Sequence, residues 1–445
     1  MASEPSKNES RMGGLPRVCV DETTSQVQPI SLMPAAALSV PLGAVMSLRF
    51  FDPRGVCAIA RLRSLVRARR FFSLFIFFFF LGCMSHGATQ YDASAEDAIA
   101  LDAGAGDGGP QPCAPPADPI QPHPTLAATG CMDSLAITRF ASGAYGYEIN
   151  SPLWSDLADK ERTFVLPPGG KIHVANCASQ PNGCLDAADD GKWVFPAGTT
   201  LLKSFGFDGK LVETRLLVAL PDGTWVGYSY QWNEGQTGAT LVASAGASVS
   251  FNTGSRTVDW TYPGRRDCTE CHTRSAGWTL GPETAQMNRV PVTAALGTGN
   301  QIDKLAAAGL FDSAPAKPYK AALVTPYAGQ LGGPPASATA TERARSYLHA
   351  NCAFCHRPDG QFNSVDLRYG AAFDRTGLCN VVPAKGTQGV ENATNLTPGH
   401  PELSTLWLRM ATLDKGRMPP LASAVVDEDA LDVVTAWING IPACP

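Results

Sequence analysis

Alternation of apolar and polar residues dominates residues 145–260, and turn-forming residues recur there at short intervals. This pattern predicts short strands in a half-buried sheet. The most regular stretch is 211–230, where Pro221-Asp222-Gly223 separates two alternating runs and predicts a hairpin. Further strands are predicted at 162–166, 171–174, 193–195 and 199–205. We therefore expect a strand-rich, β-sandwich-like domain in this part of the chain.

Aromatic residues are concentrated in the same stretch, among them Trp154, Trp193, Trp225 and Trp232. Large rings on inward-facing positions fill the core of a small β-domain. We expect that role here. Binding of a sugar or quinone ring is the alternative, and with a sugar this part would be a carbohydrate-binding module.

Helical periodicity begins at 264–312 and returns near the C-terminus. Thr339-x-x-Glu342 is a capping-box pattern, which predicts the start of a helix. Acidic residues at 427–429 open a last predicted helix, whose Leu431, Val434 and Ile438 share one face. The fold class expected for the whole chain is therefore α+β, with an all-α domain at the C-terminal end.

The longest apolar run, 71–82, has 12 residues and follows a basic stretch. It is shorter than the roughly 20 residues that span a bilayer. A basic segment, a short apolar segment and small residues at its end describe an export signal. Leu81-Gly82-Cys83 is similar to a bacterial lipobox, which predicts that Cys83 is lipidated and anchors an exported lipoprotein to a membrane. A plain cleaved signal or an uncleaved anchor is the alternative.

The chain between this signal and the predicted strands is rich in Ala, Gly, Asp and Pro and contains no basic residue between Arg70 and Arg139. Such a composition cannot bury a core and predicts a flexible tether. The expected segments are a leader at 1–82, a tether at 83–127, a β-rich domain at 128–312, a linker at 313–338 and a helical domain at 339–445.

Composition narrows the function. The 445 residues carry a net charge of −5, and loss of the leader would leave about −10. Such a charge argues against nucleic acid as a partner. Thirteen cysteines against seven histidines is a high ratio, which fits an oxidising compartment and needs a further explanation.

Two C-x-x-C-H motifs supply that explanation. They are Cys268-Thr269-Glu270-Cys271-His272 and Cys352-Ala353-Phe354-Cys355-His356. The spacing is that of covalent haem c attachment: one helical turn brings two thiols to the haem vinyl groups, and the adjacent His becomes an axial iron ligand. Structural zinc is the alternative, but its C-x-x-C pairs usually lie about 15–20 residues apart. A thioredoxin-like site needs one motif in a βαβ context. We therefore predict two covalently bound haem c groups.

The sequence identifies the second axial ligand of each haem less clearly than the first. Gly416-Arg417-Met418-Pro419-Pro420 presents a thioether on a backbone restricted by proline, so Met418 is the expected sixth ligand of the second haem, with Met410 and His400 as weaker competitors. For the first haem, Met287 is the best single candidate. The further possibilities are His173, His349 or an open position.

Six cysteines remain after the leader, Cys83 and the motifs are set aside. Six allow 15 pairings. Cys177–Cys184 is the expected disulfide across a short loop. Locality and elimination then favour Cys113–Cys131 and Cys379–Cys444.

Several blocks outside the motifs carry a resemblance. They are Ile149-Asn150-Ser151-Pro152-Leu153-Trp154-Ser155-Asp156, 160–167, 195–199, 213–215, 230–234 and Arg417-Met418-Pro419-Pro420. With the two motifs, these blocks resemble a family of bacterial exported dihaem c-type cytochromes, mostly uncharacterised, over about two thirds of the chain. The order helix, C-x-x-C-H, loop, Met-Pro, helix resembles a class I cytochrome c domain. The resemblance implies electron transfer or an associated redox role and supplies no substrate.

Two functions follow as expectations. The first is an electron carrier in the periplasm, tethered to the outer membrane or cell envelope, that exchanges electrons with a redox partner protein. The second is a peroxidase-like dihaem oxidoreductase with its substrate at the first haem. We favour the carrier, because no sequence motif announces a distal acid or base.

Overall fold

The computed structural model describes residues 47–51, 57–61, 113, 116, 118–131, 143–177, 186–189, 191–254, 256–293, 296–327, 335 and 337–445. Two compact units divide the chain, Met1–Ala98 and Ile99–Pro445. In the first unit, β1 (Ser47–Phe51) pairs antiparallel with β2 (Cys57–Arg61). The predicted signal and Cys83 lie outside the described residues, as does most of the tether. No helix in the described part of the chain has the length and apolarity needed to cross a membrane.

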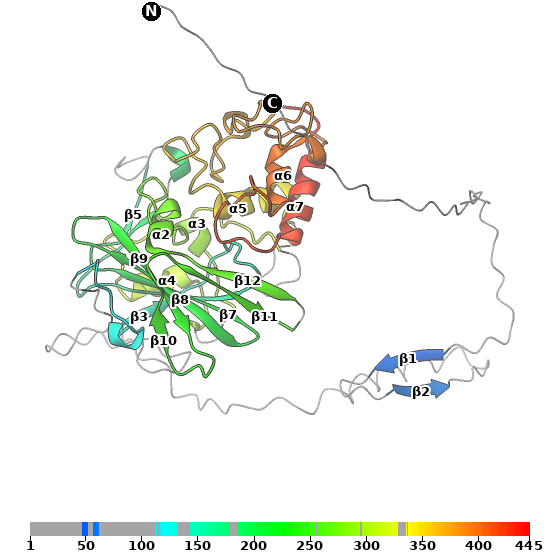
Figure 1. Cartoon of the computed structure of the whole chain (residues 1–445). Helices are drawn as coiled ribbons and strands as arrows, with labels where there is room; N and C mark the ends of the chain where they lie inside the picture. The colour runs from blue at the N-terminus through cyan, green and yellow to red at the C-terminus, as the bar shows by residue number, and fades with distance from the viewer. Residues whose placement is uncertain are drawn as a thin grey trace, which may run out of the picture. The chain divides into compact units, whose positions relative to one another are not determined.

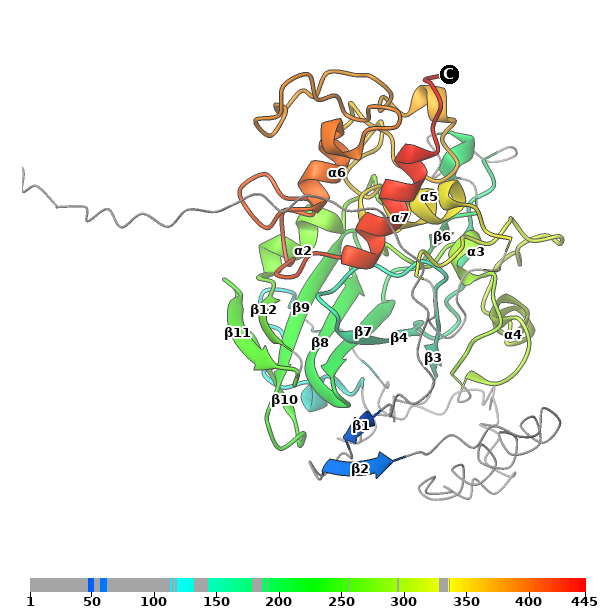
Figure 2. The ribbon, with the colours of Figure 1, turned by 90° about the vertical axis from the view of Figure 1, so that its right-hand side faces the viewer.

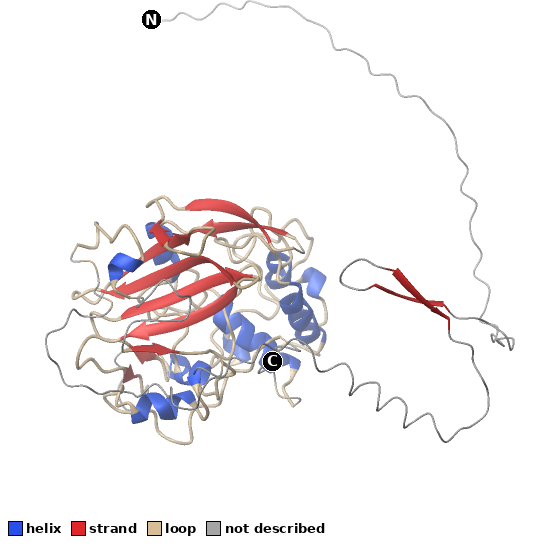
Figure 3. Ribbon diagram, turned by 90° about the horizontal axis from the view of Figure 1, so that it is seen from below, coloured by secondary structure: helices blue, strands red, loops and turns tan. Residues whose placement is uncertain are grey.

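The second unit is built on a six-stranded antiparallel sheet in the order β10-β9-β8-β7-β4-β3. Its strands, drawn as arrows in Figure 1 and red in Figure 3, are β3 (Ala144–Gly146), β4 (Asp159–Val165), β7 (Thr200–Phe207), β8 (Lys210–Ala219), β9 (Trp225–Trp232) and β10 (Ala239–Leu241). Two hairpins accompany it: β5 (His173–Val174) with β6 (Trp193–Val194), and β11 (Ala247–Asn252) with β12 (Thr257–Tyr262).

The hairpin expected at 211–230 is confirmed by β8 and β9. Its turn forms where Leu220 N–H donates to the Thr224 carbonyl at 2.8 Å, and Gly223 adopts φ 80°, which glycine tolerates without a steric penalty. Nearly every residue of β8 is buried, on both faces. One face joins a core with α3 and α4, and the other packs against strand neighbours and the Cys113–Cys131 segment. The aromatic residues Trp193 and Trp225 lie in the first of these cores, as the core interpretation expects.

Six α-helices lie in the described residues: α2 (Arg265–Cys271), α3 (Thr284–Met287), α4 (Gln301–Ala307), α5 (Ala340–Asn351), α6 (Thr405–Met410) and α7 (Glu428–Asn439). Figure 2 shows α5, α6 and α7 grouped beyond one end of strands β7, β8 and β9. Both long helices begin as the sequence predicts. Thr339 and Glu342 form the capping box of α5, and Asp427 caps α7 through Ala430 N–H.

The fold class expected from the sequence is wrong. The second unit is strand-rich with few helices, and no all-α cytochrome c-like domain is evident at the C-terminal end of the described chain. Between α5 and α6 the chain runs through turns held by isolated bridges such as Cys379–Leu396 and Thr394–Ser404, because this stretch is rich in Gly, Pro and Asn. The boundaries proposed at 313–338 stay a prediction, and Ile99–Pro445 form one compact unit.

Disulfides join Cys113 to Cys131 and Cys379 to Cys444, which are two of the expected pairings. Cys177 is also disulfide-bonded, while its expected partner Cys184 lies outside the described residues. The four cysteines of the two motifs are the free ones in the described part of the chain. The structure thus separates a set of structural cysteines from a set available for other chemistry.

Candidate cofactor sites

The second motif follows directly from the end of α5. Cys352 N–H donates to the Leu348 carbonyl at 2.9 Å, and His356 N–H donates to the Cys352 carbonyl at 2.9 Å. One turn of chain therefore separates the first thiol from the histidine. Burial raises the pKa of the Cys352 thiol to about 12, so this thiol is protonated at neutral pH.

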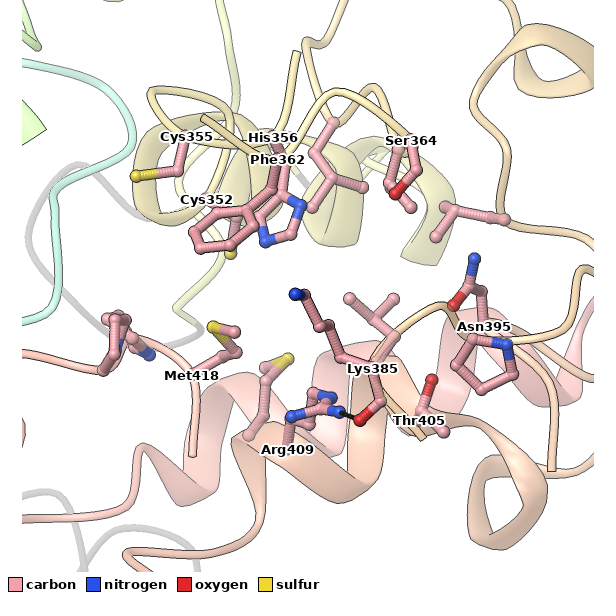
Figure 4. Close-up of a pocket in the computed structure, with 18 of the residues that line it drawn as sticks. Cys352, Cys355, His356, Phe362, Ser364, Lys385, Asn395, Thr405, Arg409 and Met418 are labelled. Atoms are coloured by element: carbon pink, nitrogen blue, oxygen red, sulfur yellow. Dashed lines mark hydrogen bonds between the residues drawn. The ribbon is translucent and has the colours of Figure 1, made fainter. Parts of the chain in front are cut away.

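A pocket with about 1050 Å³ of empty space, part of it open to solvent, opens beside this motif. Figure 4 shows Cys352, Cys355 and His356 on one side of it and Met418 on the opposite side. The remaining lining is mainly apolar and includes Phe362, Val365, Leu367, Leu378, Pro383, Leu406, Met410, Pro419 and Pro420. The pocket therefore brings the predicted His–Met pair to one cavity, with Met410 also in its wall.

Both side chains of this pair are held in place. His356 stacks on Phe362 at 5.4 Å between ring centroids, its Nδ1 is buried without a hydrogen-bond partner in the described residues, and burial lowers its pKa. A neutral imidazole is the form that binds a metal. Met418 N–H donates to the Arg409 carbonyl at 2.8 Å, and the Arg409 guanidinium donates to the Gly416 carbonyl at 2.9 Å. α6 thus positions the Met418 loop, whereas His400 lies on the surface beside Glu402.

The first motif lies on α2, which packs on β9. A Cβ added to Gly227 would lie 2.6 Å from Cys268 Sγ, so this approach needs glycine at that position. His272 Nδ1 lies 2.5 Å from the Trp278 carbonyl. Burial lowers the pKa of His272 to about 4, so the ring is neutral and Nδ1 donates, which leaves Nε2 as a ligand. A carbonyl that orients the other ring nitrogen is typical of metal-binding histidines.

Another pocket, called the first pocket because it adjoins the first motif, has about 1000 Å³ of empty space and opens beside Cys268, Cys271 and His272. The sheet contributes Arg215, Leu216, Leu217 and Gly227 to its wall, and most of the remaining lining comes from Leu153–Asp156, from β12 and α2, and from the loop that follows Met418. This lining contains no further His or Met among the residues that the structure describes.

The candidates for a sixth ligand at the first motif are all elsewhere. Met287 is fully buried in the core beneath the sheet, with its sulfur 3.8 Å from Gln301 Nε2. His173 pairs with Asp312 at 2.9 Å, and His349 pairs with Glu283 at 3.0 Å. Sequence analysis could not separate a core methionine from a ligand, because both occupy apolar positions.

The two pockets are neighbours although their motifs lie far apart in the sequence. Cys355 Sγ lies 3.9 Å from the Glu270 carbonyl oxygen. Phe354, from the second motif, lines both pockets, as does Pro419. Phe354, which stands between the two cysteines of the second motif in the sequence, therefore contributes an aromatic ring to both sites.

The block 149–156 fixes the sheet to the C-terminal region. Trp154 N–H donates to Asn351 Oδ1 at 2.6 Å, and its indole N–H donates to the Val425 carbonyl at 2.9 Å. Asp156 Oδ1 accepts from the Ala424 and Val425 N–H groups, both at 2.9 Å. Residues 149–156 therefore connect the walls of the first pocket through hydrogen bonds.

Sequence analysis missed Arg215, Phe354 and the role of Trp278. Arg215 and Glu213 are charged residues within a mostly buried strand, and charged residues at inward-facing positions are a signal of function that is visible in the sequence. The Trp278 contribution is a backbone carbonyl, for which no sequence signal exists.

The chain matches no family model, no curated protein and no solved structure in the comparisons made. The resemblance drawn from the sequence therefore stays a prediction. In the described residues, no group of three or more His, Cys, Asp and Glu side chains gathers as a metal-ion site.

Proposed function

We propose that this chain is an exported c-type cytochrome that carries electrons through two covalently bound haem c groups. The observation that carries the proposal is the lining of the pocket at the second motif: two free thiols and a neutral histidine face a methionine across a mainly apolar cavity. Covalent haem attachment requires the first three groups, and a His–Met pair is a common axial set of electron-transfer haems.

At each site the cysteines and the axial ligands have different roles. At the second motif, Cys352 and Cys355 would hold the group, with His356 and Met418 as axial ligands. A thioether ligand and apolar walls favour the reduced state, which raises the reduction potential. Haem c itself supplies a one-electron redox centre. At the first motif, Cys268, Cys271 and His272 take the same roles, with His272 oriented by the Trp278 carbonyl.

Proximity of the two sites supports electron transfer within the chain. The contact of Cys355 with the Glu270 carbonyl and the shared wall residues Phe354 and Pro419 bring the attachment points together. A carrier with two neighbouring centres can accept an electron at one and deliver it at the other to a periplasmic partner protein.

Export completes the proposal. The apolar run 71–82 directs the chain out of the cytoplasm, and lipidation of Cys83 tethers it to the cell envelope through the segment that follows. The disulfides of the second unit fit an oxidising compartment, where haem c attachment also takes place.

A second candidate is a dihaem oxidoreductase with peroxidase-like chemistry at the first site. The observation in its favour is that no further His or Met among the described residues lines the pocket of His272. Cyanide distinguishes the two: an open site binds it quickly with a change in the optical and electron paramagnetic resonance spectra, whereas two six-coordinate carriers bind it slowly.

The test of the main proposal is a haem stain on denaturing gels of the protein exported from cells that mature c-type cytochromes. Cys268→Ala and Cys352→Ala should each lose about half of the stain, and the double variant all of it, because each motif holds one haem. Complete loss in either single variant, or no loss in both, contradicts two independent attachment sites.

A further inference from the structure

Three cationic side chains lie directly opposite one another on adjacent strands. Arg162 of β4 pairs in register with Lys203 of β7, which pairs with Arg215 of β8. Residues paired across antiparallel strands point to the same face, so the three form one row across the sheet. Like charges directly opposite destabilise a sheet, and this row therefore needs negative charge close to it.

The described residues supply that charge to only one of the three. Arg215 makes a two-pronged ion pair with Glu213, at 2.8 and 2.9 Å, and Glu213 is fully buried and also accepts from Trp260 at 3.0 Å. Glu148, a carboxylate whose charge acts on Arg162, forms an ion pair with Arg289 at 2.9 Å. Glu213 and Glu148 therefore already have other partners.

Arg162 and Lys203 form no ion pair with any residue in the described part of the chain. Arg162 Nη2 is buried and makes no hydrogen bond within the part of the chain that the structure describes. The Lys203 ammonium lies 4.9 Å from the centre of the Phe205 ring and makes no hydrogen bond or ion pair with any described residue. Burial lowers the pKa of both groups, that of Lys203 strongly. An unpaired buried charge lowers the free energy of unfolding by several kcal/mol. Two such cations side by side are therefore expected where a ligand supplies the counter-charge.

The row faces the first motif. Gly227 of β9, against which Cys268 packs, is opposite Leu217 of β8, two residues along from Arg215 on the same face. Arg215, Leu217 and Gly227 line one pocket with Cys271 and His272. A group bonded to the two thiols of α2 would therefore lie on the face that carries the row.

We propose that Arg162, Lys203 and Arg215 form a binding site for the carboxylate groups of a ligand held in the first pocket. The inference rests on the proposed function, because haem carries two propionate carboxylates, and two cations of the row form no ion pair with any residue that the structure describes. A small free carboxylate that enters the pocket has the same chemistry. The test therefore has one arm for each source.

The first arm compares Lys203→Met with Lys210→Met in the full-length, haem-loaded protein. Lys210 is exposed at the start of β8, so its replacement removes the same charge from the surface of the same sheet. If the row holds the propionates, Lys203→Met shifts the propionate bending bands in the resonance Raman spectrum and lowers the melting temperature, and Lys210→Met does neither.

The second arm titrates formate into the wild-type protein and into Lys203→Met. If the row holds a diffusing carboxylate, formate changes the haem spectrum saturably, Lys203→Met weakens its binding at least about tenfold, and the propionate bands stay in place. Either pattern supports the site. Arg162→Met should behave like Lys203→Met. If the Lys203→Met protein does not accumulate, both experiments are done with Arg162→Met instead.

Two results overturn the inference. One is a Lys203→Met protein whose propionate bands and formate response equal those of wild type. The other is a higher melting temperature in Lys203→Met, which would show that the row is uncompensated in the loaded protein. Failure of the proposed function is a separate result: a wild-type peptide containing Cys268 and Cys271 that carries no haem mass.

Discussion

A cluster of buried charges behind the second motif offers a quantitative test of the packing around the proposed haem sites. Arg357, which directly follows His356, donates to both oxygens of Asp189 at 2.8 and 2.9 Å. Lys192 and Arg368 contact the same carboxylate at 2.9 and 3.3 Å. The Asp189 side chain is 1 % exposed and that of Arg357 is 4 % exposed, so solvent screens this ion pair little. Asp189→Asn would leave three cations around a neutral amide.

The expected loss in the free energy of unfolding depends on which carboxylates each cation still contacts in Asp189→Asn. Removal of one partner of a buried pair costs about 3–5 kcal/mol. Arg368 keeps Asp366 at 2.7 Å and Asp186 at 2.7 Å, whereas among the described residues Arg357 keeps a single carboxylate, that of Asp359 at 2.7 Å. We therefore expect a value at the lower end, about 3 kcal/mol. Residues 113–445 have an unfolding entropy of about 0.7 kcal/mol/K, so the melting temperature should fall by about 4 °C.

Asp359→Asn is the matched control, because it removes a carboxylate from the same Arg357 at a similar distance. The Asp359 side chain is 39 % exposed, and exposed ion pairs contribute at most about 1 kcal/mol. Melting followed by far-ultraviolet circular dichroism should therefore show a shift of about 1 °C or less. Equal shifts in the two variants would refute the argument that burial makes the Asp189 pair strong.

The other predictions concern the two sites and one buried lysine. Met418→Ala should abolish the weak red-end absorption band of a sulfur–iron bond and lower one reduction potential. Met410→Ala should retain the band. The reverse result would make Met410 the ligand. Gly227→Ala should reduce haem attachment at the first motif, judged by haem stain, because the added Cβ would collide with Cys268, whereas Gly235→Ala, with its nearest contact at 3.8 Å, should not. Burial lowers the pKa of Lys160 to about 7, so unfolding takes up a proton above that pH and the free energy of unfolding rises with pH towards about 10. Lys160→Met should flatten this rise in urea titrations at pH 7 and 9, and an unchanged slope would show that Lys160 is charged in the folded protein.

Local patterns predicted the elements that depend on neighbouring residues. The 211–230 hairpin, the capping box at Thr339 and the amphipathic face of α7 are encoded within a few residues of each other, and each is present. The pairing of His356 with Met418 in one pocket was also predictable, since a motif and a proline-flanked methionine carry specific chemistry.

Contacts between distant residues were not predictable from the pattern. Trp154 reaches Asn351 and Val425 across 197 and 271 residues, and such contacts merge the C-terminal segment with the sheet instead of leaving it as a helical domain. The row of Arg162, Lys203 and Arg215 exists only through strand register, which a single sequence does not specify. Met287 lies in the core with Leu305 and is not among the residues that line the first pocket, and an apolar position in a sequence gives no sign of which of the two it faces.

The central claim is that two haems are bonded to this chain, one at each motif. Mass spectrometry of the intact exported protein and of its peptides tests it most directly. The account predicts two haem masses per chain, one on the peptide with Cys268 and Cys271 and one on the peptide with Cys352 and Cys355. A chain that gains no haem mass when exported from cells that mature c-type cytochromes would contradict it.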